Sequence, residues 1–326
     1  MLNSLVSIGV PCYNRPIGLD RLLSQLSRQS FSDIEIIVSD NYSPDKSVIS
    51  IARKHALTDP RIKVFQQSKN IGAVGNHDFV KKRAQGKYFL WVHDDDELPE
   101  NYIEICLKHL EAVPEATLVG PSCDRYLDGE FWLTPDNWSS EGQKTYERLS
   151  TLMPDGFNCH WRFEQYLSGL FLLEAAPNHV SKDFKSQFHH FFVLSEAGSI
   201  IHAPELKLIK HTDQENIRKY TTGEIYRRHW ILKFFGWDTV ESVQQCMPIT
   251  LQMLRTIIGS KRLTIKEKYK LIAQCVHLFV RYSVKDETNR FRRKHNFKRI
   301  KRIPSWIGGK IKNSLTKSIS ILTPYI

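Results

Sequence analysis

The first 120 residues alternate between strand-like and helix-like segments, and this alternation restricts the possible folds more than any other feature. Short runs rich in β-branched residues end in loops. The segments between them carry apolar residues at every third or fourth position, which is the period of an amphipathic helix. Strands that alternate with helices favour a parallel, doubly wound sheet. We predict strands at residues 5–10, 34–40, 61–65, 87–92 and 116–120.

Two of the intervening helices have recognisable starts. Ser43 followed by Pro44 is typical of an N-cap and a first helical position, so we expect a helix over 43–56. Pro99 predicts the start of the helix that leads to the fifth strand. Beyond about residue 223 the apolar spacing is helical. We therefore expect an α/β fold with a mostly parallel sheet and a helical C-terminal extension.

Composition excludes several classes of protein. Hydrophobic content is 41% and charged content is 25%, as in ordinary soluble globular proteins. The chain starts without the basic region of a secretory signal, and its most apolar segments, 167–176 and 275–284, are too short to span a membrane. The six cysteines are scattered without a Cys-x-x-Cys pair, so we expect reduced thiols instead of disulfides or a zinc site.

The positive charge is concentrated near the C-terminal end. The net charge is +11, and residues 285–326 contain twelve Lys or Arg but only two acidic residues. Such a segment could bind nucleic acid or an anionic membrane surface, or it could simply be solvated. The amphipathic stretch at 305–326 favours the membrane, where each nearby basic residue contributes about 1 kcal/mol.

The segment GKYFLWVHDDDELPENY places His93 and three consecutive carboxylates at the end of the fourth predicted strand. Adjacent carboxylates repel one another. A divalent cation would remove this repulsion, and Mg²⁺ or Mn²⁺ prefers oxygen ligands supplied by carboxylates and substrate phosphates. The pattern indicates a metal–diphosphate site in a surface crevice. The alternative is a solvated acidic turn that caps the helix at Pro99.

Three polar segments follow three of the predicted strands. They read PCYNR, SDNYSPD and HDDD, and they follow the first, second and fourth strands. In doubly wound sheets, ligands bind outside the carboxyl ends of the strands. We therefore expect these three segments to converge on one binding site.

Four segments carry a resemblance to a known family. They are VSIGVPCYNRPIGLDRLLSQLSRQSF, IEIIVSDNYSPD, KNIGAVGN and AQGKYFLWVHDDDELPENYIE, and in their order and spacing the first 120 residues resemble the family 2 inverting glycosyltransferases of the GT-A fold. A looser resemblance covers 165–213. It implies a GT-A domain over 1–215, with a nucleotide-binding half at 1–120 and an acceptor half at 121–215. A helical region with a basic amphipathic tail would occupy 216–326.

The resemblance implies roles for individual positions. Pro11 and Tyr13 would line the nucleobase slot, Asp40 would accept a hydrogen bond from the base, and Lys69 would lie along the ribose and diphosphate. The full set implied for the nucleotide-sugar comprises Pro11, Tyr13, Asn14, Arg15, Asp40, Lys69, Asn70, Gly72, Asn76, Asp94 and Asp95.

The resemblance also implies a metal site for Mn²⁺ or Mg²⁺. Asp94 and Asp96 would form the Asp-x-Asp pair, with Asp95 as the alternative if the register shifts by one. His211 matches the family's late histidine beside the donor diphosphate. His93 takes a place that often holds another Asp or Ser, and it is a further candidate ligand.

Inverting transfer requires a general base, because the acceptor hydroxyl attacks in a single displacement. The family usually has an acidic residue a little over ten positions before the glycine that corresponds to Gly198. Here that neighbourhood contains His189 and His190, and the nearest carboxylate, Asp183, lies somewhat earlier. A histidine has a suitable pKa for the role, so the choice between the His pair and Asp183 stays open.

Together these features predict an inverting hexosyl- or N-acetylhexosaminyl-transferase that uses a UDP-sugar. It would act on a glycan or lipid-linked acceptor in bacterial lipopolysaccharide O-antigen or capsule assembly. It would lie in the cytoplasm, peripherally bound to the inner face of the membrane, without a specific nucleic-acid partner. The alternatives are a nucleotidyltransferase of similar fold and a non-enzymatic basic protein that binds nucleic acid.

Overall fold

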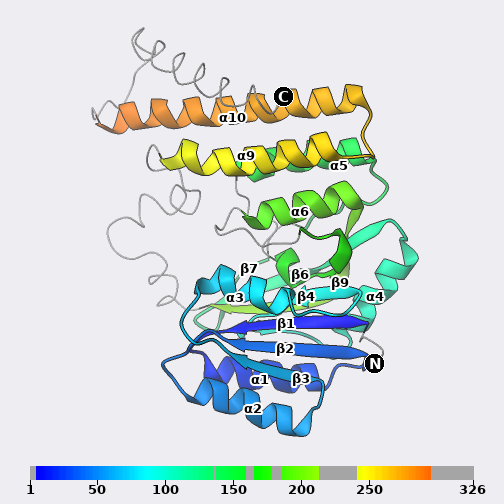
Figure 1. Ribbon diagram of the computed structural model, residues 1–326, viewed down its shortest axis with the longest axis vertical. Helices are drawn as coiled ribbons and strands as arrows, with labels where there is room; N and C mark the ends of the chain where they lie inside the picture. The colour runs from blue at the N-terminus through cyan, green and yellow to red at the C-terminus, as the bar shows by residue number, and fades with distance from the viewer. Residues whose placement is uncertain (1–4, 135–136, 159–164, 178–185, 213–240, 295–326) are drawn as a thin grey trace. The chain divides into compact units, whose positions relative to one another are not determined.

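A single mixed sheet runs through the part of the chain before residue 213 in the computed structural model (Figure 1). The structure describes residues 5–134, 137–158, 165–177, 186–212 and 241–294. Within these residues the sheet has nine strands in the order β3-β2-β1-β4-β8-β6-β9-β5, with β7 beside β6. The strands are β1 (Val6–Cys12), β2 (Ile34–Asp40), β3 (Ile62–Gln66), β4 (Tyr88–Trp91), β5 (Asp96–Glu97), β6 (Ala116–Leu127), β7 (Glu130–Leu133), β8 (Leu170–Leu172) and β9 (Ser199–Thr212).

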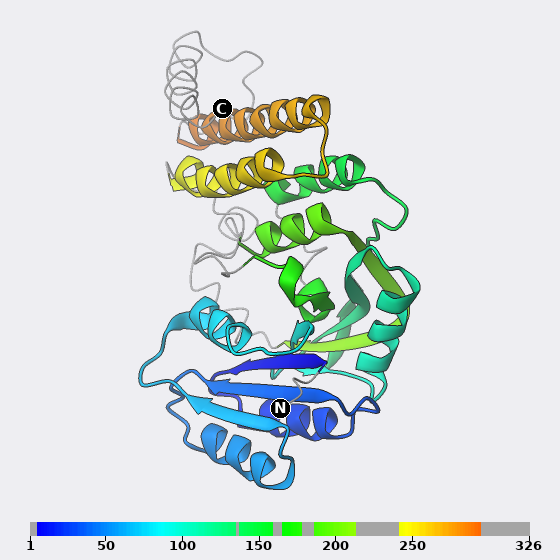
Figure 2. The ribbon, with the colours of Figure 1, turned by 45° about the vertical axis from the view of Figure 1, so that its right-hand side comes forward.

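Helices cover both faces of the first four strands. Figures 1 and 2 show α1 and α2 on one side of β1, β2 and β3, and α3 on the other side. The helices are α1 (Pro16–Ser27), α2 (Ser47–Thr58), α3 (Gly72–Lys81), α4 (Tyr102–Ala112), α5 (Thr145–Asn158), α6 (Ser186–Ala197), α9 (Glu241–Gly259) and α10 (Ile265–Lys294), with short 3-10 turns η2 (Gln165–Ser168) and η3 (Leu173–Ala175).

Parallel pairing dominates the first half of the sheet, as the alternating sequence predicts. Strand β1 pairs in parallel with both β2 and β4, and the register sets Cys12 opposite Asp40 at the carboxyl ends. The second half departs from strict alternation because β8 pairs antiparallel with both β4 and β6. The predicted α/β class with a mostly parallel sheet is confirmed.

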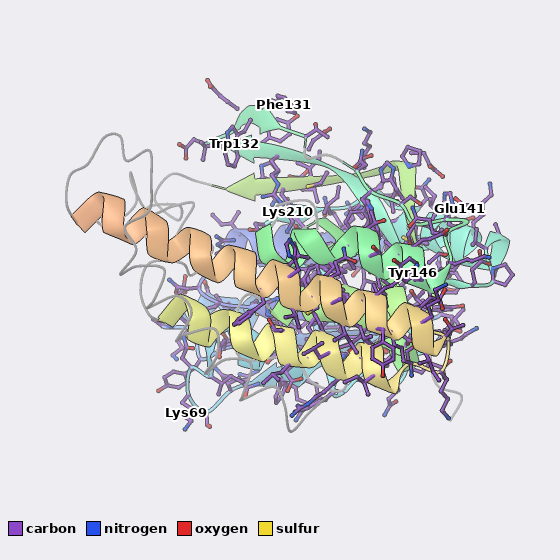
Figure 3. All side chains as sticks on the ribbon, turned by 90° about the horizontal axis from the view of Figure 1, so that it is seen from above. Lys69, Phe131, Trp132, Glu141, Tyr146 and Lys210 are labelled. Atoms are coloured by element: carbon purple, nitrogen blue, oxygen red, sulfur yellow. The ribbon has the colours of Figure 1, made fainter. Side chains whose placement is uncertain are left out.

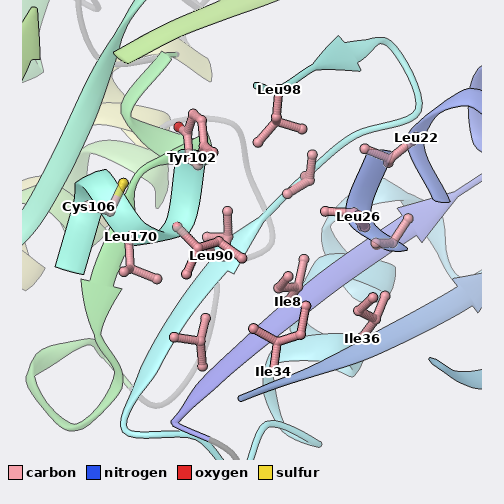
Figure 4. Packing of buried hydrophobic residues seen from close by; sticks show 14 of the residues in the cluster. Ile8, Leu22, Leu26, Ile34, Ile36, Leu90, Leu98, Tyr102, Cys106 and Leu170 are labelled. Carbon is pink, nitrogen blue, oxygen red and sulfur yellow. The ribbon is translucent and has the colours of Figure 1, made fainter. Parts of the chain in front are cut away.

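The hydrophobic core lies between this sheet and helices α1 and α4. Figure 4 shows side chains from β1, β2 and β4 packed between those of the two helices. Tyr102 is fully buried, and its hydroxyl donates a 2.6 Å hydrogen bond to the carbonyl oxygen of Ser168. Four buried cysteines are free thiols, as predicted for reduced cysteines: Cys12, Cys106, Cys123 and Cys275.

Two predicted helix starts are wrong. Helix α2 begins at Ser47 with Lys46 at the N-cap, three residues later than the expected start at Pro44. Ser43 does not cap that helix because its hydroxyl and backbone N–H both bind the carboxylate of Asp40. Helix α4 begins at Tyr102, with the residues from Pro99 forming a preceding turn.

Contacts between Cα atoms divide the chain into two compact units. One comprises 1–152 and 159–222, and the other comprises 153–158 and 223–326. In the second unit α9 and α10 pack against each other and bury apolar side chains such as Leu254 and Phe279. None of the helices among the described residues is long and apolar enough to cross a membrane. The basic segment overlaps α10 as far as Lys294, and 295–326 lie outside the described residues.

A buried carboxylate joins the parallel strands near the start of β1. Glu35 on β2 is only 3% exposed. Its oxygens accept hydrogen bonds from the Ser7 hydroxyl at 2.5 Å, the Lys63 ammonium at 2.7 Å and the Gln85 backbone N–H at 2.7 Å. Burial alone would raise the pKa of Glu35, but the hydrogen bonds, first from Lys63, lower it below its ordinary value of 4.5.

Glu35→Gln should destabilise the protein by about 2 kcal/mol at pH 7, because the hydrogen bonds from Ser7 and Lys63 lose a charged acceptor. The folded-state pKa of Glu35 lies below the unfolded value, so this stability is present above about pH 4.5 and is lost as the pH falls through the folded pKa. Chemical denaturation should therefore show a difference between wild type and variant that shrinks in acid. Glu111→Gln on the exposed face of α4 is the control, and a difference independent of pH would contradict this assignment.

Candidate functional site

The three polar segments predicted to converge do lie together at the carboxyl ends of β1, β2 and β4. The Asn14 backbone N–H donates to the Ser43 hydroxyl at 2.9 Å, which connects the first segment to the second. Arg15 Nη1 lies 3.2 Å from Asp94 Oδ1 and 3.1 Å from Asp95 Oδ2, which connects the first segment to the acidic motif. This edge of the sheet is the candidate active site.

Asp40 is held firmly at the end of β2. Its side chain is 1% exposed. Oδ1 accepts hydrogen bonds from the Ser43 hydroxyl at 2.5 Å and the Ser43 N–H at 3.0 Å, and Oδ2 accepts one from Gln66 Nε2 at 3.2 Å. The carboxylate thus fixes the loop after β2, and both of its oxygens are bonded within the protein.

Exposed aromatic rings flank this carboxylate. Tyr13 is 43% exposed and follows β1 directly, whereas Pro11 lies buried within the strand. Tyr42 is 50% exposed, adopts a left-handed backbone conformation with φ of 63°, and has the Lys46 ammonium 5.2 Å from its ring centroid. Of the two residues predicted to line the base, Tyr13 presents an accessible ring, whereas Pro11 is buried within β1.

The loop between β3 and α3 is organised by two asparagines. Asn70 Oδ1 accepts from Asn41 Nδ2 at 3.2 Å and from the Gly72 N–H at 2.8 Å, and Asn41 Oδ1 accepts from the Ile71 N–H at 2.9 Å. Lys69 is exposed and projects outward (Figure 3). Sequence reasoning missed Asn41, although its place directly after Asp40 was a signal.

Asn76 was predicted to contact the donor, but the structure buries it on the inner side of α3. The residue is 2% exposed. Its Oδ1 accepts from the Ser39 hydroxyl at 2.6 Å, and its Nδ2 donates to the Ser39 carbonyl oxygen at 2.8 Å. Both contacts join α3 to β2, so the Asn76 amide positions the helix. The polar atoms of this amide are thus bonded within the protein.

Asp96 lies in the interior, which corrects the expectation that the whole acidic motif faces a surface crevice. It is fully buried on β5, opposite Lys210 on β9. Lys210 Nζ lies 2.7 Å from Oδ1, and Oδ2 accepts from Ser168 Oγ at 3.0 Å and from the His93 N–H at 3.0 Å. Burial raises the pKa of Asp96, but Lys210 and His93 outweigh it and lower the pKa well below the ordinary range.

The other two carboxylates share one guanidinium. Asp94 is 8% exposed and pairs with Arg15. Burial and the neighbouring Asp95 raise the pKa of Asp94 to about 6, against the opposing attraction of Arg15. Asp95 also pairs with Arg15, and its side chain is more accessible at 28%. Asp95 is therefore the carboxylate of the motif that solvent reaches most easily.

A divalent cation fits part of this motif. His93, Asp95 and Asp96 each offer one ligand atom, and these atoms all lie within 4.8 Å of one another. Carboxylate oxygens suit Mg²⁺ and Mn²⁺, and an imidazole nitrogen is a common ligand of transition-metal ions. Asp94 is outside this group. His211, predicted as a metal or phosphate contact, instead has its Nε2 2.6 Å from Glu97 Oε1.

A second histidine, His77 on α3, meets His93 and was missed by sequence reasoning. The two Nε2 atoms are 2.8 Å apart. Desolvation and the neighbouring His93 ring lower the pKa of His77 to about 3, so the ring is neutral. His77 is the sixth residue of α3 and directly follows the KNIGAVGN segment, but only the folded arrangement shows that its ring meets His93.

The candidate bases on α6 lie in different environments. His190 is 5% exposed and packs edge-on against Trp91 and Phe171, with ring centroids 5.3 and 4.7 Å away. Burial lowers the pKa of His190 well below its usual range, and desolvation lowers that of the half-buried His189. Asp183 lies outside the described residues.

Comparison with known proteins gives consistent results. The model of glycosyl transferase family 2 matches residues 7–166. WcaA of Escherichia coli (strain K12), assigned to colanic acid biosynthesis as a glycosyl transferase, is 25% identical over 205 residues, which cover 61% of this chain and 73% of WcaA. The GalNAc(5)-diNAcBac-PP-undecaprenol β-1,3-glucosyltransferase of Campylobacter jejuni is 38% identical over 96 residues, covering 28% of this chain and only 30% of that enzyme.

Among solved structures, Staphylococcus aureus TarS 1-349 in complex with UDP-GlcNAc is similar, with a TM-score of 0.56 at 15% sequence identity. The similarity covers 84% of this chain and 72% of that chain. The sheet order and this similarity define a GT-A fold. Residues 7–166 form a glycosyl transferase family 2 domain, as the sequence motifs predict.

Gly18 on α1 sets the position of the acidic motif. A Cβ atom at Gly18 would lie 2.0 Å from the carbonyl oxygen of Asp94, far closer than atoms can approach. The backbone of the motif therefore rests directly on the first turn of α1, and only glycine leaves room for it.

The sign of the change in stability caused by Gly18→Ala tests this contact. Helix propensity alone would make alanine more stable by about 0.5–1 kcal/mol, whereas overpacking against the Asp94 backbone costs about 1–3 kcal/mol. We expect a lower thermal midpoint in this variant. Gly259→Ala at the end of α9, where nothing lies within 4 Å of the new Cβ, is the matched control and should not lose stability. A stabilised Gly18→Ala protein would show that the motif does not rest on α1.

Proposed function

We propose that the chain transfers a sugar, with inversion, from a UDP-sugar to a glycan or lipid-linked acceptor during bacterial surface-polysaccharide assembly, such as O-antigen or capsule. The observation that carries this proposal is the convergence of Tyr13, Asp40 and the acidic motif on one edge of the sheet. Family membership favours sugar transfer over the nucleotidyl transfer that the sequence left open.

The donor would lie along this edge. The exposed ring of Tyr13 offers a stacking face for the base, and Asp40 beside it has its carboxylate held in place by Ser43. Lys69 and the backbone around Gly72 are the proposed contacts for ribose and diphosphate, and Gly72 has a positive φ of 78° that glycine adopts without strain. Asn14 and Arg15 shape the floor of the site through Ser43 and Asp94.

The leaving diphosphate requires positive charge at the acidic motif. His93, Asp95 and Asp96 are the proposed residues for Mn²⁺ or Mg²⁺, which when bound would neutralise charge on the departing diphosphate. Lys210 supplies a fixed ammonium group at the buried end of the motif. Preorganised charges of this kind stabilise a transition state without reorganisation.

The acceptor hydroxyl requires a base, and we retain the three predicted residues for this role. His189 is half-buried, and desolvation lowers its pKa, which favours the neutral ring that a base requires. It is more accessible than His190, which packs among aromatic rings. Asp183 is the carboxylate alternative.

The names of two relatives support the proposed acceptor class. WcaA is assigned to colanic acid biosynthesis, and the Campylobacter jejuni enzyme is named for a saccharide linked to undecaprenol diphosphate. A lipid-linked acceptor would place the enzyme at the inner face of the bacterial membrane. The basic segment at 285–326 would provide that attachment by attraction to anionic lipids.

Incubation with a panel of nucleotide-sugars and Mn²⁺ should release free UDP and not pyrophosphate, and the product should have the opposite anomeric configuration to the donor by NMR. Tyr13→Ala should raise the donor KM at least about fivefold with little change in kcat, because stacking on a base contributes about 1–3 kcal/mol. Tyr269→Ala, which removes an exposed ring on α10, is the control. Release of pyrophosphate, or no cleavage of any donor, would overturn the proposed reaction.

The basic segment is tested in the full chain by charge reversal. Changing four residues to Glu should abolish co-sedimentation with anionic vesicles: Lys298, Arg299, Lys301 and Arg302. High salt should have the same effect on the wild type, because exposed charges are screened over about 8 Å at physiological ionic strength. The control reverses four exposed lysines elsewhere, Lys54, Lys108, Lys207 and Lys261, for an equal change in net charge. Equal binding by both variants would contradict membrane attachment through 285–326.

A further inference from the structure

Two neighbouring aromatic side chains are exposed on the hairpin formed by β6 and β7. Phe131 is 59% exposed and Trp132 is 38% exposed, and Figure 3 shows both on the outer part of this hairpin. Burying such a ring would stabilise a protein, yet most of the Phe131 side chain faces solvent. Contiguous exposed apolar groups, unlike scattered ones, indicate a binding surface.

The backbone of the hairpin holds these rings in place. Asp128 and Gly129 form a two-residue turn between the strands. Their φ angles of 52° and 86° are those of the tight turn that matches the twist of paired strands. Directly after Phe131 the register shifts, which makes Trp132 an extra residue on β7. Bulges of this kind re-aim side chains at sheet edges and beside active sites.

Phe131 is the outer end of a row of rings that crosses three strands. Tyr126 on β6 lies opposite Phe131 on β7 and opposite His211 on β9. The Tyr126 ring centroid is 5.9 Å from that of Phe131 and 5.8 Å from that of His211. The His211 N–H then donates a 2.9 Å hydrogen bond to the Asp95 carbonyl oxygen. The row therefore connects the hairpin to the acidic motif, where the donor is proposed to bind.

The charges of the hairpin favour a sugar over a lipid surface. Asp128 and Glu130 are exposed, whereas Arg125, the basic residue of the hairpin, is only 6% exposed. An anionic membrane would repel the exposed carboxylates. A sugar ring suits both features of the hairpin, because its apolar C–H face can pack against an aromatic ring and its hydroxyl groups can donate hydrogen bonds to carboxylates.

We propose that Phe131, backed by Tyr126, stacks against a sugar ring of the acceptor glycan beside the acidic motif. Phenylalanine has no hydrogen-bonding group, so it recognises the apolar face of the sugar. Rings of the β-gluco or β-galacto configuration fit best because they present several C–H groups on one face. The inference rests on the proposed function for its biological role, since it assigns an acceptor subsite of that reaction.

Fluorine NMR of the full-length protein labelled with fluorophenylalanine provides a direct test. The probes are cellobiose, lactose and N,N′-diacetylchitobiose, each with and without UDP. The Phe131 signal is identified by its loss in Phe131→Leu, a variant that should keep the wild-type thermal midpoint because the ring is exposed. At least one disaccharide should shift the Phe131 signal. No shift with any of the probes, with or without UDP, would overturn the proposal.

Two variants distinguish stacking from general apolar contact. Phe131→Leu keeps an apolar side chain but removes the ring, so its affinity for the disaccharide should fall at least about fivefold by isothermal titration. Phe131→Trp keeps a ring and should bind at least as tightly as the wild type. Tyr269→Leu, which removes an exposed ring on α10, is the matched control. Equal affinity in Phe131→Leu and the wild type would contradict stacking on Phe131.

Lipid is the competing occupant, and vesicles containing phosphatidylglycerol test it. Co-sedimentation with these vesicles should be the same for the wild type and Phe131→Ala. Loss of vesicle binding in Phe131→Ala, with unchanged affinity for the disaccharides, would show that the hairpin contacts lipid and would overturn the proposal.

The measurements separate this inference from the proposed function. A disaccharide that shifts the Phe131 signal in a protein that cleaves no nucleotide-sugar would support the sugar subsite and refute the proposed reaction. Transfer from a UDP-sugar with the same acceptor KM in the wild type and Phe131→Leu would support the reaction and refute the subsite.

Discussion

The buried ion pair between Asp96 and Lys210 is the interaction on which the acidic motif depends. A buried carboxylate left without a counter-charge costs several kcal/mol, so Asp96 can stay ionised only where β5 pairs with β9 in the observed register. The hydroxyl of Ser168 and the His93 N–H use its remaining lone pairs. Segments far apart in the sequence thus fix the loop that presents Asp94 and Asp95.

The ammonium group of Lys210 and the guanidinium of Arg15 offset most of the negative charge of the motif. Three consecutive carboxylates suggest a strongly negative site, but Arg15 and Lys210 supply two positive charges within 3.2 Å of their oxygens. The motif is therefore nearly neutral before any ligand arrives. A cation entering such a site gains less from electrostatic attraction than it would beside three unpaired carboxylates.

Local patterns predicted the first half of the fold well because its elements are long enough to show a period. Strand β2 has the predicted bounds, 34–40, and the three polar segments meet as the parallel arrangement requires. The short antiparallel strands β5 and β8 have no period to detect. The predicted N-cap at Ser43 was wrong because the Ser43 side chain binds the Asp40 carboxylate instead of the helix. Lys210 gave no signal in the sequence because its pairing with Asp96 depends on strand register.

Contacts from opposite faces of the sheet determine the remaining geometry of the site. Helix α1 contributes Gly18 beneath the Asp94 carbonyl, and α3 on the other face contributes His77 against His93 (Figures 1 and 2). The loop after β4 is therefore held between two helices that were themselves placed by core packing. Because the position of this loop is fixed before any ligand binds, little ordering would be required on binding. Charges held rigidly in this way can stabilise a transition state without reorganisation.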